Sequence, residues 1–214
     1  MEDLYKHQAL RKKLVEQLKK SGIKDFKVLQ AIEKIPRHFF FNSAFLQFAY
    51  DDVAFQIGEG QTISQPYTVA RQTELLEVRK GDKILEIGTG SGYQSAILST
   101  LGAEVYSIER NKKLHERAKA MLKQLHCHVQ CFYGDGYKGL PEFAPFDRII
   151  VTAAAPYVPE PLLEQLKLRG ILVIPVDSKG SAQTMKKIRK TGENEYDTKD
   201  YGNFSFVPLL GETN

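Results

Sequence analysis

The sequence predicts an α/β protein with a doubly wound, mostly parallel β-sheet. Short apolar, β-branched runs alternate with amphipathic segments from residue 83 onward, and a glycine-rich turn follows the first of these runs. Repeated strand–helix units of this kind form parallel sheets that helices cover on both faces. The C-terminal part departs from this alternation, because it holds two strand-like segments with no helix between them. We therefore expect an antiparallel pair at the end of the sheet.

The length of 214 residues suits a single domain with its own hydrophobic core. Hydrophobic residues make up 42% of the chain and charged residues 26%, as in ordinary soluble globular proteins. Within one unit we expect an N-terminal helical extension (1–55), a loop with a following helix (56–78), a central α/β core (79–176) and C-terminal strands (177–214).

Charge and hydropathy argue against several kinds of partner. The net charge of +4 is mild and most basic residues are spread along the chain, so we expect no nucleic-acid partner. No apolar stretch approaches 18 residues, so we expect no membrane span. The first residues show no signal-peptide core, and we expect a cytoplasmic protein in which Cys127 and Cys131 are free thiols.

The N-terminal extension is predicted to begin with two amphipathic helices. Apolar residues recur at helical spacing between residues 4 and 18, and Gly22 ends that pattern. Asp25 is placed to cap the second helix, which Pro36 terminates. The phenylalanines at 39–48 are expected to pack this extension onto the rest of the chain.

The segment between the extension and the core is predicted to be a functional loop followed by a helix. Residues 57–67 show no clear period and contain two glycines. A loop of this length inside a compact domain is more often functional than idle. The spacing of Val69, Leu75, Leu76 and Val78 predicts a helix over residues 68–78.

The positions of apolar residues also predict the strands and helices of the core and of the C-terminal tail. Core strands are predicted at 84–87, 104–108, 129–133, 148–152 and 171–175, with helices at 93–101, 112–125 and 160–166. The tail is predicted to hold strands at 183–189 and 204–209, joined by the polar segment 190–203.

The first core strand carries the signature of a nucleotide-type cofactor site. Its end is marked by Glu86, and glycines follow at 88, 90 and 92, where a helix opens. A strand, a glycine turn and a helix N-terminus let backbone lie directly against a ligand. A dinucleotide fingerprint would place its third glycine at position 93, which is Tyr93 here. This spacing argues against a nicotinamide dehydrogenase.

Three carboxylates at the ends of successive strands favour S-adenosylmethionine as the cofactor. Glu86 suits a ligand with a cationic amino group. Glu109 closes the second strand, where a carboxylate can accept both hydroxyls of a ribose. Asp135 ends the third strand, placed to meet an adenine amino group. Together they indicate a nucleoside with an amino-acid tail and no phosphates.

A metal site is not expected from the histidines and cysteines near residue 126. His126 and His128 could ligate a metal together with Cys127 and Cys131. Alternation along a strand would send the two histidines to one face and the two cysteines to the other. We therefore predict no metal.

Four segments resemble the protein-L-isoaspartate (D-aspartate) O-methyltransferase family. They read GQTISQPYTVA, EIGTGSGYQSA, VYSIER and GDGYKGLPEFAPFDRIIVTAAAP, and the resemblance runs from about residue 23 to 210. It implies a Rossmann-like fold that uses S-adenosylmethionine and releases S-adenosylhomocysteine. The implied substrate is an L-isoaspartyl or D-aspartyl residue in a damaged protein, whose methyl ester proceeds to a succinimide in a repair reaction.

The resemblance also assigns roles to individual residues. Ser64 corresponds to the family's active-site hydroxyl. The cofactor-binding residues it implies, together with the carboxylates above, are Gln61, Thr62, Ile63, Tyr67, Glu86, Gly88, Gly90, Gly92, Glu109, Asp135 and Gly136. Tyr67 stands where some members have histidine, and the tail 204–210 matches the family ending only at 207–209.

Two other functions stay open at this point. A methyltransferase acting on RNA or a small molecule is disfavoured, because base-amino methylation usually needs an Asn/Asp-Pro-Pro-aromatic loop where this chain has Thr152 and three alanines. A non-catalytic adaptor would bind the cofactor or damaged protein without turnover. We expect isoaspartyl proteins and peptides as substrates, and a monomer.

Overall fold

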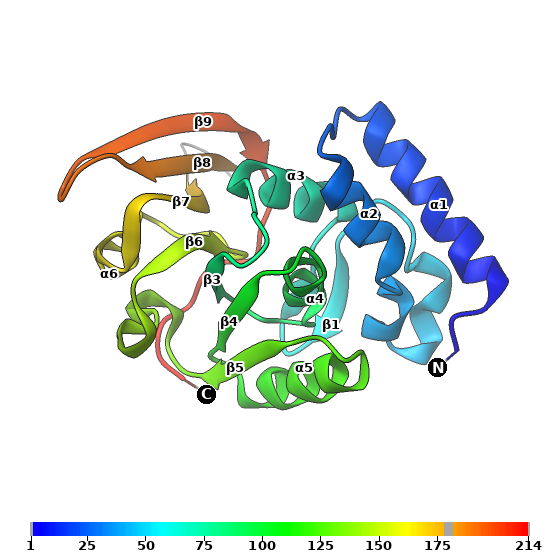
Figure 1. Ribbon diagram of the computed structural model, residues 1–214. Helices are drawn as coiled ribbons and strands as arrows, with labels where there is room; N and C mark the ends of the chain where they lie inside the picture. The colour runs from blue at the N-terminus through cyan, green and yellow to red at the C-terminus, as the bar shows by residue number, and fades with distance from the viewer. Residues whose placement is uncertain (1, 178–181, 214) are drawn as a thin grey trace.

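The computed structural model describes residues 2–177 and 182–213, and its centre is a seven-stranded sheet in the order β5-β4-β3-β6-β7-β8-β9 (Figure 1). The strands are β3 (Lys83–Ile87), β4 (Glu104–Glu109), β5 (Val129–Tyr133), β6 (Phe146–Val151), β7 (Leu166–Asp177), β8 (Gln183–Lys190) and β9 (Tyr196–Phe204). Pairing is parallel from β5 to β7, and β8 and β9 are antiparallel. The predicted mostly parallel sheet with an antiparallel end is confirmed.

Helices cover both faces of the sheet because its central strands are apolar on both sides. Ile84 and Ile150 pack under α3 (Pro66–Leu76) and α4 (Tyr93–Thr100), and α5 (Lys112–Gln124) packs against β5. Leu85 and Ile149 pack on the opposite side with Leu162 of the short helix α6 (Glu160–Glu164). The sheet is therefore doubly wound, as predicted.

The chain reverses its direction across the sheet at β3. It runs outward from β3 to β4 and β5, and then crosses back to β6 on the other side of β3. Open parallel sheets bind ligands at the carboxyl ends of their strands where the order reverses. The ends of β3, β4 and β6 therefore mark the expected site.

The N-terminal extension consists of α1 (Tyr5–Lys20), α2 (Phe26–Lys34) and the 3-10 turns η1 (Arg37–Phe40) and η2 (Ser43–Phe48) (Figure 1). Asp25 caps α2 as predicted, because its carboxylate accepts the backbone N–H groups of residues 27 and 28. The buried faces of α1 and α2 form one core with Val69 and Ile97, so the extension is packed onto the outer side of α3 and α4.

The prediction of an irregular loop over residues 57–67 is wrong in part. The structure has a hairpin there, formed by β1 (Phe55–Gly58) and β2 (Gln61–Ile63). Residues 58–60 at its tip all have positive φ. Such short strands leave too few positions for a period to show in the sequence.

Two boundaries in the C-terminal half also differ from the prediction. The helix predicted at 160–166 ends at Glu164, and Leu166 already begins β7. The last strand is Tyr196–Phe204, and all of it except Phe204 lies in the predicted polar connection 190–203, whereas the predicted strand is 204–209. β9 is an edge strand with mostly exposed side chains, so backbone pairing with β8 forms it without an apolar pattern. Residues 178–181 and 214 of the predicted C-terminal part, and residue 1, lie outside the described residues.

The segment around residue 126 is not a strand. His126 follows α5 with a φ of 53°, and β5 begins only at Val129, so residues 126–128 do not alternate between the two faces of a strand. Cys127 and Cys131 are free thiols, as predicted. None of the helices in the described part of the chain has the length and apolar character needed to cross a bilayer.

Candidate functional site

The glycine turn after β3 is fixed by hydrogen bonds and by close contacts. The backbone N–H of Gly88 donates to the carbonyl of Ile108 at 2.9 Å. Gly88 has a φ of +91°, and a Cβ atom there would lie 2.7 Å from Oγ1 of Thr152. Thr152 in turn donates from Oγ1 to the Gly88 carbonyl at 2.7 Å. Only glycine fits this position, both in backbone conformation and in space.

The carboxylate of Glu109 binds the backbone of the glycine turn at Gly90. Its Oε2 accepts the N–H of Gly90 at 2.9 Å, and its Oε1 accepts the N–H of Asn111 at 2.9 Å. The residue is buried at the end of β4. A carboxylate oxygen accepts more than one hydrogen bond, so both oxygens keep capacity for a ligand hydroxyl.

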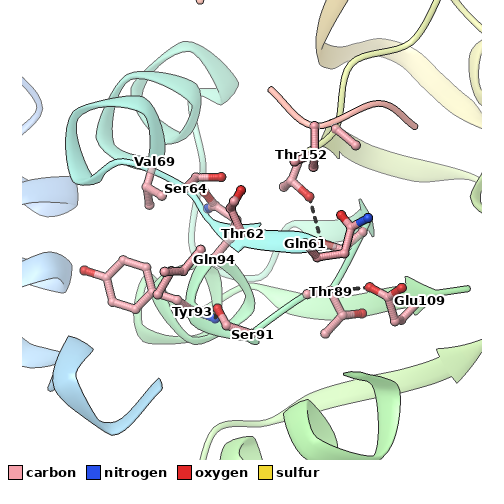
Figure 2. A pocket seen from close by; sticks show the side chains of 15 residues that line it. Gln61, Thr62, Ser64, Val69, Thr89, Ser91, Tyr93, Gln94, Glu109 and Thr152 are labelled. Carbon is pink, nitrogen blue, oxygen red and sulfur yellow. Dashed lines mark hydrogen bonds between the residues drawn. The ribbon is translucent and has the colours of Figure 1, made fainter. Parts of the chain in front are cut away.

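A cavity opens in front of this turn (Figure 2). Its wall consists of Gln61, Thr62, Ile63, Ser64, Val69, Gly88, Thr89, Gly90, Ser91, Tyr93, Gln94, Glu109, Thr152, Ala153 and Val207. Figure 2 shows the labelled side chains arriving from the β2 strand and the start of α3, from the glycine turn and α4, and from the ends of β4 and β6. The cavity therefore lies at the point where the sheet order reverses.

Seven of the predicted site residues line this cavity together. They are Gln61, Thr62, Ile63, Ser64, Gly88, Gly90 and Glu109. Segments that are distant in the sequence are thus brought to one site, with the 61–64 segment facing the glycine turn.

Four other predicted residues lie outside the cavity wall. Gly92 begins α4, where an added Cβ would meet Leu122 at 3.3 Å. The ring of Tyr67 stacks on Phe204, with 6.4 Å between ring centroids. Asp135 and Gly136 follow β5, and there the carboxylate of Asp135 accepts the N–H of Glu212 at 3.2 Å. Their contacts with a cofactor stay predictions.

Several residues of the cavity wall are not among the site residues predicted from the sequence. Thr89 and Ser91 stand between the assigned glycines, so the glycine pattern itself could have pointed to them. Val69 lies one helical turn after the 61–64 segment, and its apolar character suggested only packing. Val207 comes from the far C-terminal segment, and no motif connects it to the turn.

The fifth predicted residue outside the cavity wall, Glu86, is fully buried beneath the glycine turn. Its Oε2 accepts a hydrogen bond from the hydroxyl of Ser95, while Oε1 has no partner among the described residues. Burial raises the pKa of Glu86 to about 7, and the nearby Glu109 carboxylate adds to this increase. Glu86 therefore changes charge near neutral pH, and its contact with a cationic amino group stays a prediction.

Glu86→Gln is expected to stabilise the protein at pH 8 and to change its stability little at pH 4.5. The folded-state pKa of about 7 lies above the unfolded value of 4.5, so the stability from neutral Glu86 is complete below pH 4.5 and is lost as the pH rises through 7. The full difference is on the order of 3 kcal/mol. Urea denaturation at both pH values measures it, with Glu104→Gln as the control. Equal stability of Glu86→Gln and the unmodified protein at pH 8 would contradict the argument.

Ser64 presents its hydroxyl to the cavity and is held by its main chain. No residue in the described ranges forms a hydrogen bond with its Oγ, whereas its carbonyl oxygen accepts Nη2 of Arg37 at 2.9 Å. A hydroxyl without a protein partner at a cavity wall is available to a bound substrate.

A group of three potential metal ligands lies away from this cavity. Asp3, His7 and His38 place ligand atoms within 4.8 Å of one another. Asp3 pairs with Arg11 at 2.8 Å, and Nδ1 of His7 accepts the N–H of Leu4 at 3.2 Å. These atoms are engaged in contacts within the N-terminal extension. The expectation of no metal stays a prediction.

Where the strand order reverses, a glycine turn and a strand-end carboxylate face one cavity at the carboxyl edge of the parallel sheet. This is the arrangement of an S-adenosylmethionine-dependent methyltransferase. A sequence profile of the protein-L-isoaspartate(D-aspartate) O-methyltransferase (PCMT) family matches residues 9–214. The chain therefore belongs to this family, as the resemblance of its motifs indicated.

Individual relatives agree with this assignment. The chain is 54% identical over 215 residues to the protein-L-isoaspartate O-methyltransferase of Flavobacterium psychrophilum, with 100% of each chain covered. It is 53% identical over 209 residues to that of Dictyoglomus thermophilum, covering 97% of this chain and 93% of the relative.

Solved structures show the same fold. A protein-L-isoaspartate O-methyltransferase superposes with a TM-score of 0.85 at 34% identity, over 94% of this chain and 66% of that one. A putative family member from Plasmodium falciparum, solved with S-adenosyl-L-homocysteine, gives a TM-score of 0.81 at 25% identity, over 94% and 98% of the two chains.

Proposed function

We propose that this protein transfers a methyl group from S-adenosylmethionine to the free α-carboxylate of L-isoaspartyl, and D-aspartyl, residues in damaged proteins. The observation that carries the proposal is the hydroxyl of Ser64, which has no hydrogen-bond partner among the described residues and lies in the same cavity wall as Glu109 and the glycine turn. Figure 2 shows Ser64 and Glu109 at different ends of this cavity. A cofactor site and an acceptor site can therefore occupy one space.

The residues present fit the cofactor. Gly88 lines the cavity and carries no side chain, so the turn offers bare backbone to a ligand. Glu109 is held rigidly by Gly90 and Asn111, with acceptor capacity left for two ribose hydroxyls. Gln61–Ile63 of β2 would cover the ligand from the opposite side. When bound, S-adenosylmethionine supplies an electrophilic methyl group.

For this reaction the protein must align the acceptor carboxylate with the methyl group and exclude water from both. An isoaspartyl α-carboxylate is already ionised at pH 7, so no general base is required. Holding it in line with the methyl group can contribute ~7–11 kcal/mol. In this proposal Ser64 donates a hydrogen bond to one carboxylate oxygen and forms no covalent adduct. The β1–β2 hairpin keeps water from the reacting groups.

Ser64→Ala is expected to lower kcat/KM for an isoaspartyl peptide by about 10- to 100-fold, because a hydrogen bond to a charged oxygen is lost. The dissociation constant for the cofactor should change little. Steady-state kinetics and calorimetry measure the two effects. Ser43→Ala is the control, since Ser43 is an exposed serine in η2. Full activity of Ser64→Ala would show that this role is wrong.

Two peptides that differ only in aspartate or isoaspartate at one position test the substrate. We expect base-labile methyl label on the isoaspartyl peptide alone. Label on neither peptide, with the cofactor bound, would favour a non-catalytic adaptor or another acceptor. Equal label on both would contradict the proposed substrate.

The same proposal implies the fate of the methyl ester and the partners of the protein. We infer that the methyl ester loses methanol to form a succinimide, which reopens partly to normal aspartate, so that the reaction repairs damaged protein. Isoaspartyl proteins and peptides are then the partners. The cytoplasmic location, the monomeric state and the single-unit organisation with its four parts stay predictions.

A further inference from the structure

We propose that Arg37 is a positioning residue of the methyl-transfer site, which it serves by holding the main chain of Ser64. The inference rests on the proposed function, in which the Ser64 hydroxyl orients the acceptor carboxylate. Arg37 belongs to η1 of the N-terminal extension and is not part of the cavity wall. It therefore acts through Ser64 rather than on the substrate.

The guanidinium of Arg37 joins two backbone segments. Nε donates to the carbonyl of Ala49 at 3.0 Å, and Nη2 donates to the carbonyl of Ser64 at 2.9 Å. The planar group lies over the rings of Tyr93, at 4.8 Å from the centroid, and Phe41, at 5.5 Å. Tyr93 is itself a cavity-wall residue. One side chain thus fixes the two walls on either side of the site relative to each other.

Arg37 is completely buried and has no ion-pair partner among residues 2–177 and 182–213. Its Nη1 also lacks a hydrogen-bond partner there. Burial lowers the pKa of Arg37 to about 10, so the side chain still carries its charge at neutral pH. A buried charge that forms no ion pair is costly for stability, and the Asp52 carboxylate offsets only part of that cost, because burial has the larger effect on the pKa of Arg37. The cost is consistent with a role in holding the active-site segment.

A second charged side chain of the extension holds the same segment from its other end. The carboxylate of Asp52 accepts the N–H of Tyr67 at 2.7 Å. The carbonyl of Ser64 and the N–H of Tyr67 flank Gln65 and Pro66, which cap and begin α3. The chain from Ser64 to the first turn of α3 is therefore clamped by Arg37 and Asp52. The N-terminal extension supplies both contacts.

Arg148 offers a matched control, because it is also buried and also binds backbone carbonyls. Its Nε donates to the carbonyl of Leu76 at 2.8 Å, at the end of α3, and it pairs with Asp82 at 3.4 Å. None of these residues lines the cavity. Arg148→Lys should therefore lower stability without the specific kinetic defect.

A double-mutant cycle tests the inference on the full chain. Arg37→Lys keeps the charge but loses the planar fork that spans two carbonyls. We expect it to lower kcat/KM for the isoaspartyl peptide about 10-fold, through the peptide KM and kcat, with the dissociation constant for S-adenosylmethionine within about 2-fold. In the Ser64→Ala background the same substitution should change kcat/KM less than about 2-fold.

Other outcomes overturn the inference. An equal loss from Arg37→Lys in both backgrounds, or the same kinetic loss in Arg148→Lys, would show that Arg37 is merely structural. Ser64→Ala with full activity would contradict the role of Ser64 and this inference together. A defective Ser64→Ala protein with additive effects would contradict the inference alone. If Arg37→Lys does not fold, the cycle is run with Arg37→Gln.

Discussion

Glu109→Ala is expected to weaken the binding of S-adenosylmethionine by at least about 100-fold. Two charge-assisted hydrogen bonds to the ribose would be lost, each worth about 1.5–3 kcal/mol, and about 1.4 kcal/mol corresponds to a factor of ten. The same substitution removes the acceptor of the Gly90 and Asn111 N–H groups, so the glycine turn loses its support. Isothermal titration with S-adenosylhomocysteine measures the effect.

Glu104→Ala is the matched control for this prediction. Glu104 begins the same strand and accepts the hydroxyl of Tyr106 at 2.6 Å, at the edge of the sheet remote from the cavity. Its loss should leave the affinity within about 2-fold. Affinity of Glu109→Ala within the same range would show that Glu109 is not the ribose ligand.

Gly88→Ala is expected to cost about 2–5 kcal/mol of folding stability and to abolish measurable cofactor binding. The left-handed backbone alone costs an alanine about 1–2 kcal/mol. The added Cβ would also lie 2.7 Å from Oγ1 of Thr152, and overpacking of this kind adds about 1–3 kcal/mol. Relief of that contact would push the turn into the space in front of it. Urea denaturation and ligand titration measure the two losses.

Gly81→Ala separates the two contributions. Gly81 has a φ of +85°, close to that of Gly88, and an added Cβ there would have no atom of the described residues within 4 Å. It should therefore show only the backbone cost and bind the cofactor normally. Equal destabilisation in the two variants would mean that the contact with Thr152 has no energetic weight.

The sequence sufficed to predict the parts of the site that are local in the chain. The glycines at 88 and 90 follow a buried strand directly, and Glu109 ends the next one, so strand ends alone place them together. The sheet was predictable for the same reason, since its central strands are continuous apolar runs. The motif GQTISQPYTVA placed Ser64 by resemblance rather than by pattern.

Contacts through the main chain could not be predicted in this way. Arg37 binds the main-chain carbonyl oxygen of Ser64. Every residue type has this oxygen, so the sequence does not indicate that the two residues are in contact. The β1–β2 hairpin and β9 are likewise formed by backbone pairing in short or exposed segments, where side-chain periodicity is weak. Such features depend on where the rest of the fold brings the backbone.

The position of the C-terminal segment has a practical consequence. Tyr137 donates to the carbonyl of Leu209 at 3.2 Å, Arg110 donates to the carbonyl of Glu212 at 2.7 Å, and the N–H of Glu212 donates to Asp135. The last described residues are therefore fastened across the proposed adenine end of the site. A purification tag or fluorescent protein fused there would emerge beside it and pull on these contacts, whereas α1 at the opposite end of the chain lies on the outside of the extension. Recombinant versions intended for binding studies should carry their tags at the N-terminus.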